Sequence, residues 1–399
     1  MSKPALADVR VIEMGQLIAG PFCGKILADF GAEVIKIEPP GLGDPLRRWR
    51  LLKDDTSLWW ETQSRGKRSV ELDLRTPEGQ QITRRLIATA DVVIENFRPG
   101  TLESWGLGWP QLSESNPGLI LLRVSGFGQD GPYRDRPGFG AVAEAIGGLR
   151  YLTGEPGRVP VRTGVSIGDT LAALHGAIGV LIALHQRKCN GGQGQVVDVA
   201  LYESVFNCMD SLLAEYSAFE FVRQPAGSAL PGVAPSNAYP CIDGTLLIAG
   251  NGDSIFKRLM QLIGRNDLAA DSTLATNDGR VANAERIDAA IAEWTRARTL
   301  STALESLERV DVPASSIYTA RDIAQDPHFR ARGMIQRSRT RTGYEVDLPG
   351  IVPKLSLTPG AHWRAAPELG ADTVEVLSRL GLGTEALANL SARAVIGKI

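Results

Sequence analysis

The chain has few residues of the kinds that bind metals or form disulfides. Its 399 residues include only four cysteines and four histidines. The cysteines are widely spaced and form neither a C-x-x-C pair nor a cluster with histidine, so no disulfide framework or metal site is expected. Free thiols in a reducing compartment are the simplest interpretation. The four cysteines are Cys23, Cys189, Cys208 and Cys241.

An excess of charge is also missing. The formal net charge is −2, so no overall basic field would recruit nucleic acid or an anionic membrane. The first residues, MSKPA, carry no signal-peptide pattern, which favours a cytoplasmic location. The most apolar helix expected, over residues 170–187, contains His175 and His185 and is interrupted by Gly176 and Gly179. We interpret it as a core helix and not as a membrane span.

The common nucleotide-binding loops are absent. The chain contains no G-x-x-x-x-G-K-[ST] loop, and no G-x-G-x-x-G follows the first expected strand. A phosphate-bearing ligand would therefore be held by arginine, lysine and backbone N–H groups. The local candidates are the basic strip 65–68 together with Arg75 and Arg98, although arginines before a strand are usually solvated surface charges.

Apolar, β-branched segments alternate with helical ones in the first part of the chain. This alternation predicts an α/β fold in which a doubly wound parallel sheet is covered by helices. Ligands of such sheets bind beyond the carboxyl ends of the strands, where residues 96–98 and 125–126 are expected. The expected strands are 9–14, 34–38, 70–74, 92–95 and 119–125, and the expected helices are 21–30 and 77–90, the latter with Thr76 as cap and Pro77 at its first position.

A change of composition divides the chain. Residues 1–222 are predicted to form the large α/β domain, the turn-rich stretch 223–228 reads as a linker, and residues 223–328 form a smaller α+β domain. Residues 329–399 form a C-terminal segment. The small domain is expected to hold strands 245–249 and 312–318 and helices 254–263, 284–298 and 301–310; the C-terminal segment is expected to hold strands 344–348 and 350–357 and helix 372–380.

Asp169 stands in a glycine-flanked loop that leads into the long apolar helix. A carboxylate there can cap the helix by accepting the free N–H groups of its first turn. It can also act as a nucleophile, because the same donors would stabilise the oxygen charge that develops when a carboxylate attacks an acyl group. The local pattern alone leaves both interpretations open.

A set of motifs in a fixed order bears on this choice. The pattern G-D-T-x-A-A around Asp169 resembles the active-site segment of the class III CoA-transferases, the family of formyl-CoA and carnitine–CoA transferases. The resemblance covers nearly the whole chain. The other motifs are AGP (19–21), LADFGAEVIKIE (27–38), GDPLR (43–47), RGKRSVELDL (65–74), ENFRPG (95–100), GFGQDGPY (126–133), GQGQVVDV (192–199) and APELG (366–370).

The resemblance implies a CoA-transferase without metal or permanently bound cofactor, in which coenzyme A is a co-substrate and Asp169 the nucleophile. It also implies a homodimer whose two chains interlock like linked rings, with a C-terminal segment that rejoins the large domain. The residues implied to line the CoA cleft are Leu72, Asp73, Leu74, Arg75, Asn96, Phe97 and Arg98; those near the acyl pocket are Leu17, Ile18 and Phe139; and those of a glycine loop that covers the nucleophile are Gly250, Asn251 and Gly252.

Two positions depart from the formyl-CoA transferase pattern. Pro39 and Ser104 stand where that enzyme has CoA-contacting arginines, and Arg47 or Arg123 is a candidate replacement. Overall similarity to the branch that uses dicarboxylates suggests succinyl-CoA as donor and a diacid such as glutarate or itaconate as acceptor. Arg47 and Arg65 are the candidate cations for the second carboxylate of such substrates.

Two other functions remain open. A 2-methylacyl-CoA racemase of the same fold would need a His–Asp acid/base pair, but the stretch that carries its histidine reads PGFG (137–140) here. A non-catalytic acyl-CoA-binding protein would bind the same ligands without forming a covalent intermediate.

Overall fold

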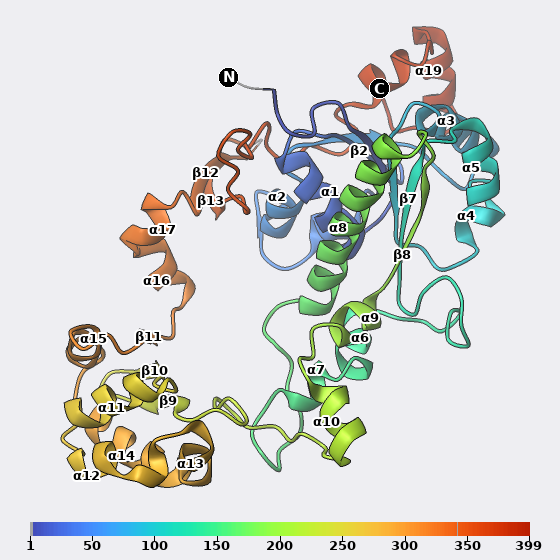
Figure 1. The fold of residues 1–399 in the computed structure, drawn as a ribbon. Coiled ribbons are helices and arrows are strands. Elements are labelled where there is room, and N and C mark those ends of the chain that lie inside the picture. Colours follow the sequence, from blue (N-terminus) through green and yellow to red (C-terminus); the bar gives the residue numbers. More distant parts are fainter. Residues whose placement is uncertain (1–2, 341) are drawn as a thin grey trace. The chain divides into compact units, whose positions relative to one another are not determined.

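The computed structural model describes residues 3–340 and 342–399, which form two compact units. The large unit consists of Met1–Arg150, Thr163–Ala214 and Arg330–Ile399, and the small unit of Tyr151–Arg162 and Glu215–Phe329 (Figure 1). Residues 151–162 and 215–222, which we assigned to the large domain from the sequence, therefore group with the small unit.

The large unit is built on a six-stranded parallel sheet in the order β5-β2-β1-β6-β7-β8. The predicted α/β class with a doubly wound parallel sheet is confirmed. The strands are β1 (Arg10–Glu13), β2 (Glu33–Glu38), β5 (Lys67–Glu71), β6 (Val92–Glu95), β7 (Ile120–Ser125) and β8 (Gln195–Ala200).

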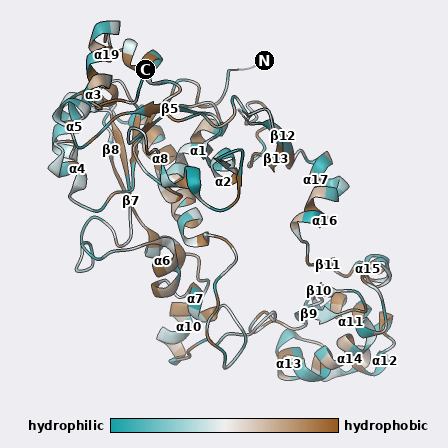
Figure 2. Ribbon diagram, turned by 180° about the vertical axis from the view of Figure 1, so that it is seen from behind, coloured by the Kyte–Doolittle hydropathy of each residue, from teal (hydrophilic) through white to brown (hydrophobic). Residues whose placement is uncertain are grey.

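Alternate residues of the strands belong to two separate hydrophobic cores, because successive side chains of a strand point to opposite faces of the sheet. Val11 and Leu122 pack with α1 (Ala19–Asp29) and α8 (Ile167–Cys189). Ile12 and its neighbours pack on the other face with α3 (Pro77–Ile87), α5 (Trp109–Ser115) and the C-terminal helices α18 (Thr373–Ser378) and α19 (Thr384–Ala392) (Figure 1). The hydropathy colouring of Figure 2 shows the hydrophobic strands between these layers.

The other helices and strands of these parts of the chain are short. They are η1 (Pro45–Arg48), β3 (Leu52–Lys53), β4 (Thr56–Ser57), α2 (Leu58–Ser64), α4 (Thr101–Ser104), α6 (Gly140–Ile146), α7 (Leu149–Leu152), α9 (Leu201–Phe206) and α10 (Leu212–Phe219).

The start of α3 follows the predicted capping chemistry. The Thr76 hydroxyl accepts a hydrogen bond from the N–H of Gly79 at 3.1 Å, and Pro77 occupies the first helical position. β5, by contrast, begins three residues before the predicted strand 70–74. Lys67 is fully buried at its start, and a hydropathy pattern does not recognise a buried lysine as part of a strand.

Helix α8 is the one helix in the described part of the chain that is long and apolar enough to cross a membrane, by length and composition alone. Its small residues Ala172, Gly176 and Val180 are buried against the sheet and α1. Its other face is apolar and exposed: Leu174, Ile178 and Ile182 are 43%, 55% and 62% exposed. The buried stripe agrees with the interpretation of a core helix.

The C-terminal segment covers the outer edge of the sheet. The N–H of Ser69 in β5 donates to Asp372, and the N–H of Glu71 donates to the hydroxyl of Thr373. These side chains satisfy donors that an edge strand would leave unpaired. The same segment forms the hairpin β12 (Ile335–Arg339) and β13 (Glu345–Pro349).

Three details of the C-terminal segment differ from the predictions. The predicted strand 350–357 is irregular, because Pro353 has no N–H for a ladder. Strand β12, which is polar, and helix α19 were not predicted, because neither segment shows a strong periodic pattern of apolar residues.

The small unit packs helices against a three-stranded antiparallel sheet in the order β11-β10-β9. Its core includes Tyr239, Leu246 and Trp294. The elements are β9 (Ser236–Pro240), β10 (Thr245–Ala249), α11 (Asp253–Leu262), α12 (Asn266–Ala270), η2 (Ser272–Leu274), α13 (Asn277–Ala282), α14 (Ala284–Arg296), α15 (Leu300–Glu308), β11 (Ala314–Ser316) and α16 (Ala320–Gln325); α17 (Pro327–Ala331) follows at the boundary between the units.

Candidate active site

A cavity of about 330 Å³ opens in the large unit beyond the carboxyl ends of β1, β6 and β7, and Asp169 lies in its wall. Four charged side chains line it: the carboxylate of Asp169 and the guanidinium groups of Arg98, Arg134 and Arg136. The remaining lining residues are Gln16, Leu17, Ile18, Ala19, Asn96, Phe97, Pro99, Val124, Ser125, Gly126, Pro137, Gly138, Phe139 and Leu201.

Asp169 is the third residue of α8, while the N-cap position belongs to Ser166. The carboxylate therefore stands in the first turn, where the positive end of the helix dipole favours a negative charge. The side chain is half-buried. It lies against the backbone of Gly140, the first residue of α6, since a Cβ added to Gly140 would come within 2.1 Å of Asp169 Oδ2.

The contact with Gly140 yields a first prediction. We expect Gly140→Ala to displace the Asp169 carboxylate and to lower kcat about 10- to 100-fold, because small misplacements of a reacting group are costly. The fold should persist, since alanine is favourable in a helix. Gly164→Ala is the matched control, because a Cβ there meets open space. Steady-state kinetics of both variants would decide, and equal kcat values would contradict the contact's importance.

Another part of the cavity wall is a tight loop between β1 and α1. Leu17 in this loop has φ 64°, a left-handed conformation that needs outside support. Asn96 supplies part of it: its Oδ1 accepts from the N–H of Gln16 at 2.8 Å, and its Nδ2 donates to the Gln16 carbonyl at 2.8 Å. The Asp44 carboxylate accepts from the N–H of Leu17 at 3.1 Å.

A buried group of charges lies beneath this loop. Lys36 Nζ is 2.9 Å from Asp44 Oδ2 and 3.1 Å from Glu13 Oε1, and it donates to the Gly15 carbonyl at 2.7 Å. Lys67 Nζ binds the second oxygen of Glu13 at 2.8 Å. Burial alone would lower the pKa of Lys36, but the surrounding carboxylates outweigh it and the pKa is raised. For Asp44, burial raises the pKa, yet Lys36 and two N–H donors hold it below its ordinary value.

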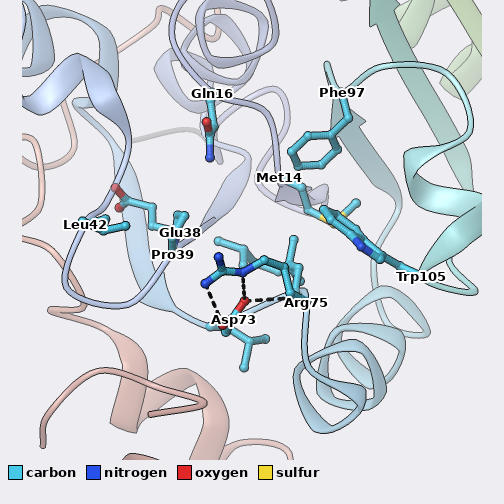
Figure 3. A pocket seen from close by; sticks show the side chains of 12 residues that line it. Met14, Gln16, Glu38, Pro39, Leu42, Asp73, Arg75, Phe97 and Trp105 are labelled. Carbon is cyan, nitrogen blue, oxygen red and sulfur yellow. Dashed lines mark hydrogen bonds and ion pairs between the residues drawn. The ribbon is translucent and has the colours of Figure 1, made fainter.

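Figure 3 shows a second cavity, of about 210 Å³. Gln16 and Phe97 line both cavities. In Figure 3, Met14, Phe97 and Trp105 are grouped on one side, and Phe97 meets Trp105 edge-on at 5.2 Å between ring centroids. The other lining residues are Ile37, Glu38, Pro39, Leu42, Leu72, Asp73, Leu74 and Arg75.

The structure thus brings the residues expected in the CoA cleft to two neighbouring cavities. Leu72 to Arg75 line the second cavity, and Asn96 and Arg98 line the first. Arg75 turns back onto Asp73, with its Nε 2.9 Å from Oδ1 (Figure 3). The three residues expected at the acyl pocket, Leu17, Ile18 and Phe139, all line the cavity that contains Asp169.

Arg47 and Arg65, predicted to read a second carboxylate, are engaged elsewhere. Arg47 donates to both oxygens of Glu38, at 2.8 and 2.7 Å, and its guanidinium stacks on Trp60 at 3.6 Å from the ring centroid. Arg65 is fully buried and donates to both oxygens of Asp29 at 3.1 Å. Neither lines a cavity described above, so we do not retain either as a substrate-binding residue.

Three other predicted cations, Lys67, Arg68 and Arg123, are also engaged within the fold. Within the basic strip 65–68, Lys67 is buried, and Arg68 pairs with Asp372 and Glu375. Arg123, a candidate replacement for the arginines missing at positions 39 and 104, is buried between two glutamates of β6 and α4. Sequence alone could not distinguish these arginines from solvated ones, because their partners are distant along the chain.

The glycine loop is found in the small unit. The Cβ of any residue replacing Gly250 would come within 2.7 Å of Leu259, and the carbonyl of Asn251 accepts from the buried Arg280 at 2.7 Å. Gly252 is the N-cap residue of α11. Packing within the small unit explains in part why these residue types occur here. That the loop covers the nucleophile stays a prediction.

Several residues of the site lay outside the predicted set: Gln16, Arg134, Arg136 and Gly140. For the two arginines a signal existed, because they follow the GFGQDGPY motif in a Gly- and Pro-rich loop after a strand. No comparable signal marks Gly140. No histidine lines either cavity among the described residues.

Comparison with known proteins agrees with this geometry. Residues 6–373 match CoA-transferase family III. The chain is 50% identical to succinyl-CoA–D-citramalate CoA-transferase of Chloroflexus aurantiacus, covering 98% of each chain. It is 34% identical to succinate–glutarate CoA-transferase of Agrobacterium fabrum over 95% of this chain and 96% of that one. The crystal structure of a CAIB/BAIF family protein from Brucella suis superimposes with a TM-score of 0.84 at 34% identity, covering 95% and 100% of the two chains.

These matches agree with the parallel sheet and with the carboxylate in the first turn of α8. Together they indicate an α/β enzyme that transfers acyl groups. The chain belongs to CoA-transferase family III, and it is a CoA-transferase.

Proposed function

We propose that this enzyme moves CoA from succinyl-CoA to a dicarboxylic acid through covalent intermediates on Asp169. One observation carries the proposal: a single cavity contains the Asp169 carboxylate together with three arginines. A carboxylate nucleophile conserves the energy of a thioester without metal or ATP. The relatives that act on D-citramalate and glutarate support succinyl-CoA or succinate as one partner and a diacid as the other.

The reaction consists of four acyl transfers. Asp169 attacks the thioester carbonyl, which gives an aspartyl–acyl anhydride and CoA thiolate. The thiolate then attacks the Asp169 carbonyl, which releases succinate and leaves an aspartyl–CoA thioester. The acceptor carboxylate attacks that thioester and forms a new anhydride, again with thiolate. Finally the thiolate attacks the acceptor's carbonyl, so that acceptor-CoA leaves and the Asp169 carboxylate returns.

Backbone N–H groups stabilise the oxyanions of these steps. Those of residues 168–170 lie in the first turn of α8, where helix N–H groups lack intrahelical partners. We further propose that the loop of Gly250, Asn251 and Gly252 covers the anhydride and excludes water.

We assign the two cavities to two parts of CoA. The apolar second cavity, with Phe97 and Trp105, suits the adenine ring, since aromatic side chains offer stacking surfaces. The pantetheine arm passes Gln16, which lines both cavities, and brings the thioester to Asp169. Arg98, exposed beside Phe97, is positioned to meet a phosphate.

The choice between diacid and monoacid tests the proposal. With succinyl-CoA as donor, we expect kcat/KM for glutarate to exceed that for valerate by about 10- to 100-fold, because a site built for a charge leaves its cations unpaired when a monoacid binds. A panel that includes citramalate, malate, itaconate and glutarate identifies the preferred acceptor. A ratio near one would remove the dicarboxylate proposal and leave the CoA-transferase activity standing.

Two further predictions remain proposals: a homodimer of interlocked chains and a cytoplasmic location. The exposed apolar residues of α8 support the first, because a monomer rarely leaves such a stripe in water. Racemase chemistry is disfavoured, since the described lining of the Asp169 cavity offers no histidine as acid or base.

A further inference from the structure

The loop between β7 and α6 contains the two arginines that sequence reasoning overlooked. Its ends touch: a Cβ added to Gly126 would lie 2.9 Å from the Cα of Gly138, so both positions need glycine. The loop therefore closes on itself, and its last residue, Phe139, precedes the Gly140 that abuts Asp169. One end of this loop is thus anchored at the nucleophile.

Arg136 stands four residues before Gly140, so its Cα lies within about 14 Å of the Gly140 Cα even if the chain is fully extended. Its side chain lines the same cavity as Asp169, as this short chain separation allows. An acyl group on Asp169 that extends along this wall brings its far end toward Arg136.

Arg136 is held in place by a series of aromatic contacts. Its guanidinium lies 3.5 Å from the ring centroid of Tyr133, and Tyr133 meets the buried Phe127 edge-on at 6.0 Å. Phe127 in turn contacts Tyr202 of α9 at 5.8 Å. Stacking uses the face of the guanidinium and leaves its N–H edges for a planar carboxylate. Such pre-orientation lowers the entropic cost of binding.

Two other arginines line the cavity that contains Asp169. Arg134 lies 3.4 Å from its exposed neighbour Asp135, a weak pair. Arg98 follows Phe97, which lines both cavities. Neither Arg98 nor Arg136 has an ion pair with any residue that the structure describes, and of the two only Arg136 is stacked on an aromatic ring.

We propose that Arg136, with Arg134 beside it, binds the distal carboxylate of the diacid and so determines acceptor specificity. This inference rests on the proposed function and replaces Arg47 and Arg65 in that role. The ligand it implies is an aliphatic dicarboxylate whose second charge lies several carbons from the acyl group.

The test compares Arg136→Ala with wild type on glutarate and valerate at saturating succinyl-CoA. Because the covalent reaction is ping-pong, kcat/KM for the acceptor reports the second half-reaction alone. We expect the glutarate-to-valerate ratio to fall about 10- to 100-fold, with the valerate value nearly unchanged. Arg136→Lys should restore part of the ratio, and Arg134→Ala should lower it less. Arg321→Ala, which removes an exposed charge from the small unit, is the matched control.

CoA binding separates this role from phosphate binding. The dissociation constant of CoA should be unchanged in Arg136→Ala and raised in Arg98→Ala. An Arg136→Ala enzyme that keeps the wild-type ratio, or that loses CoA affinity and slows equally on both acids, overturns the assignment. A wild-type ratio near one overturns the proposed function itself, and the assignment with it.

Discussion

Asp169→Asn should lower turnover at least about 10³-fold while leaving the fold intact. The amide has nearly the shape of the carboxylate but cannot form the anhydride, and removal of a covalent nucleophile costs this much or more in other enzymes. The stability change should be small, because Asp169 is not the N-cap residue and a charge in the first turn contributes only about 0.3–1 kcal/mol. The measurement is the initial rate of CoA transfer from succinyl-CoA to the best acceptor.

A trapping experiment gives the same test a chemical readout. Wild-type enzyme mixed with acyl-CoA and hydroxylamine should form a hydroxamate at Asp169, detectable by peptide mass, and the asparagine variant should not. Asp278→Asn is the matched control, because Asp278 is an exposed acid in the first turn of α13. Turnover within about tenfold of wild type in Asp169→Asn would require another nucleophile.

Lys36→Met should destabilise the large unit by about 3–5 kcal/mol, because it removes the cation paired with the buried Asp44 and one of the two cations paired with Glu13, which keeps Lys67. Glu13 and Asp44 are both at most 1% exposed. The loss should appear in urea unfolding followed by tryptophan fluorescence, which reports mainly the large unit since Trp294 alone belongs to the small one. The surface substitution Lys257→Met should change stability by less than about 0.5 kcal/mol.

The pH dependence of this loss has a definite sign. The pKa of Asp44 is lowered in the folded protein from its ordinary value of 3.8, so its contribution to stability is present above pH 3.8 and disappears as the pH falls further. Without Lys36 this acid-sensitive contribution shrinks. The double variant with Asp44→Asn should recover part of the stability, because it removes the buried carboxylate that has lost its cation. A loss below about 1 kcal/mol in Lys36→Met would show that the buried Asp44 carboxylate tolerates the loss of its cation.

The most apolar strands were the most predictable part of the fold, whereas β8 and β9 were not predicted as strands. Segments 92–95 and 245–249 coincide with β6 and β10, because short apolar, β-branched runs bounded by turn residues leave little choice. The start of β5 was less predictable, since Lys67 is buried there and its charge is paired with Glu13, 54 residues away along the chain. A periodicity argument weighs neighbours in sequence and has no access to such a partner.

The same limit applied to the site. Asp169 was recognised through a motif, and its surroundings at the end of the sheet agree with that recognition. No sequence pattern shows that Arg47 and Arg65, unlike Arg136, are neutralised, in their case by Glu38 and Asp29. Ion pairing in the folded protein decides which arginine keeps its N–H edges for a ligand. The sequence alone does not show that pairing.

The covered edge of the sheet has a consequence for biosynthesis. A ribosome makes β5 some 300 residues before Asp372 and Thr373, which satisfy its edge. Throughout translation of the small unit, the nascent large unit exposes an unpaired strand edge and the apolar face that Val376 and Leu377 later cover. Such an edge can recruit other chains. Truncations that remove α18 and α19 should therefore yield an aggregating polypeptide and not a smaller enzyme, and chaperone demand should peak before those helices emerge.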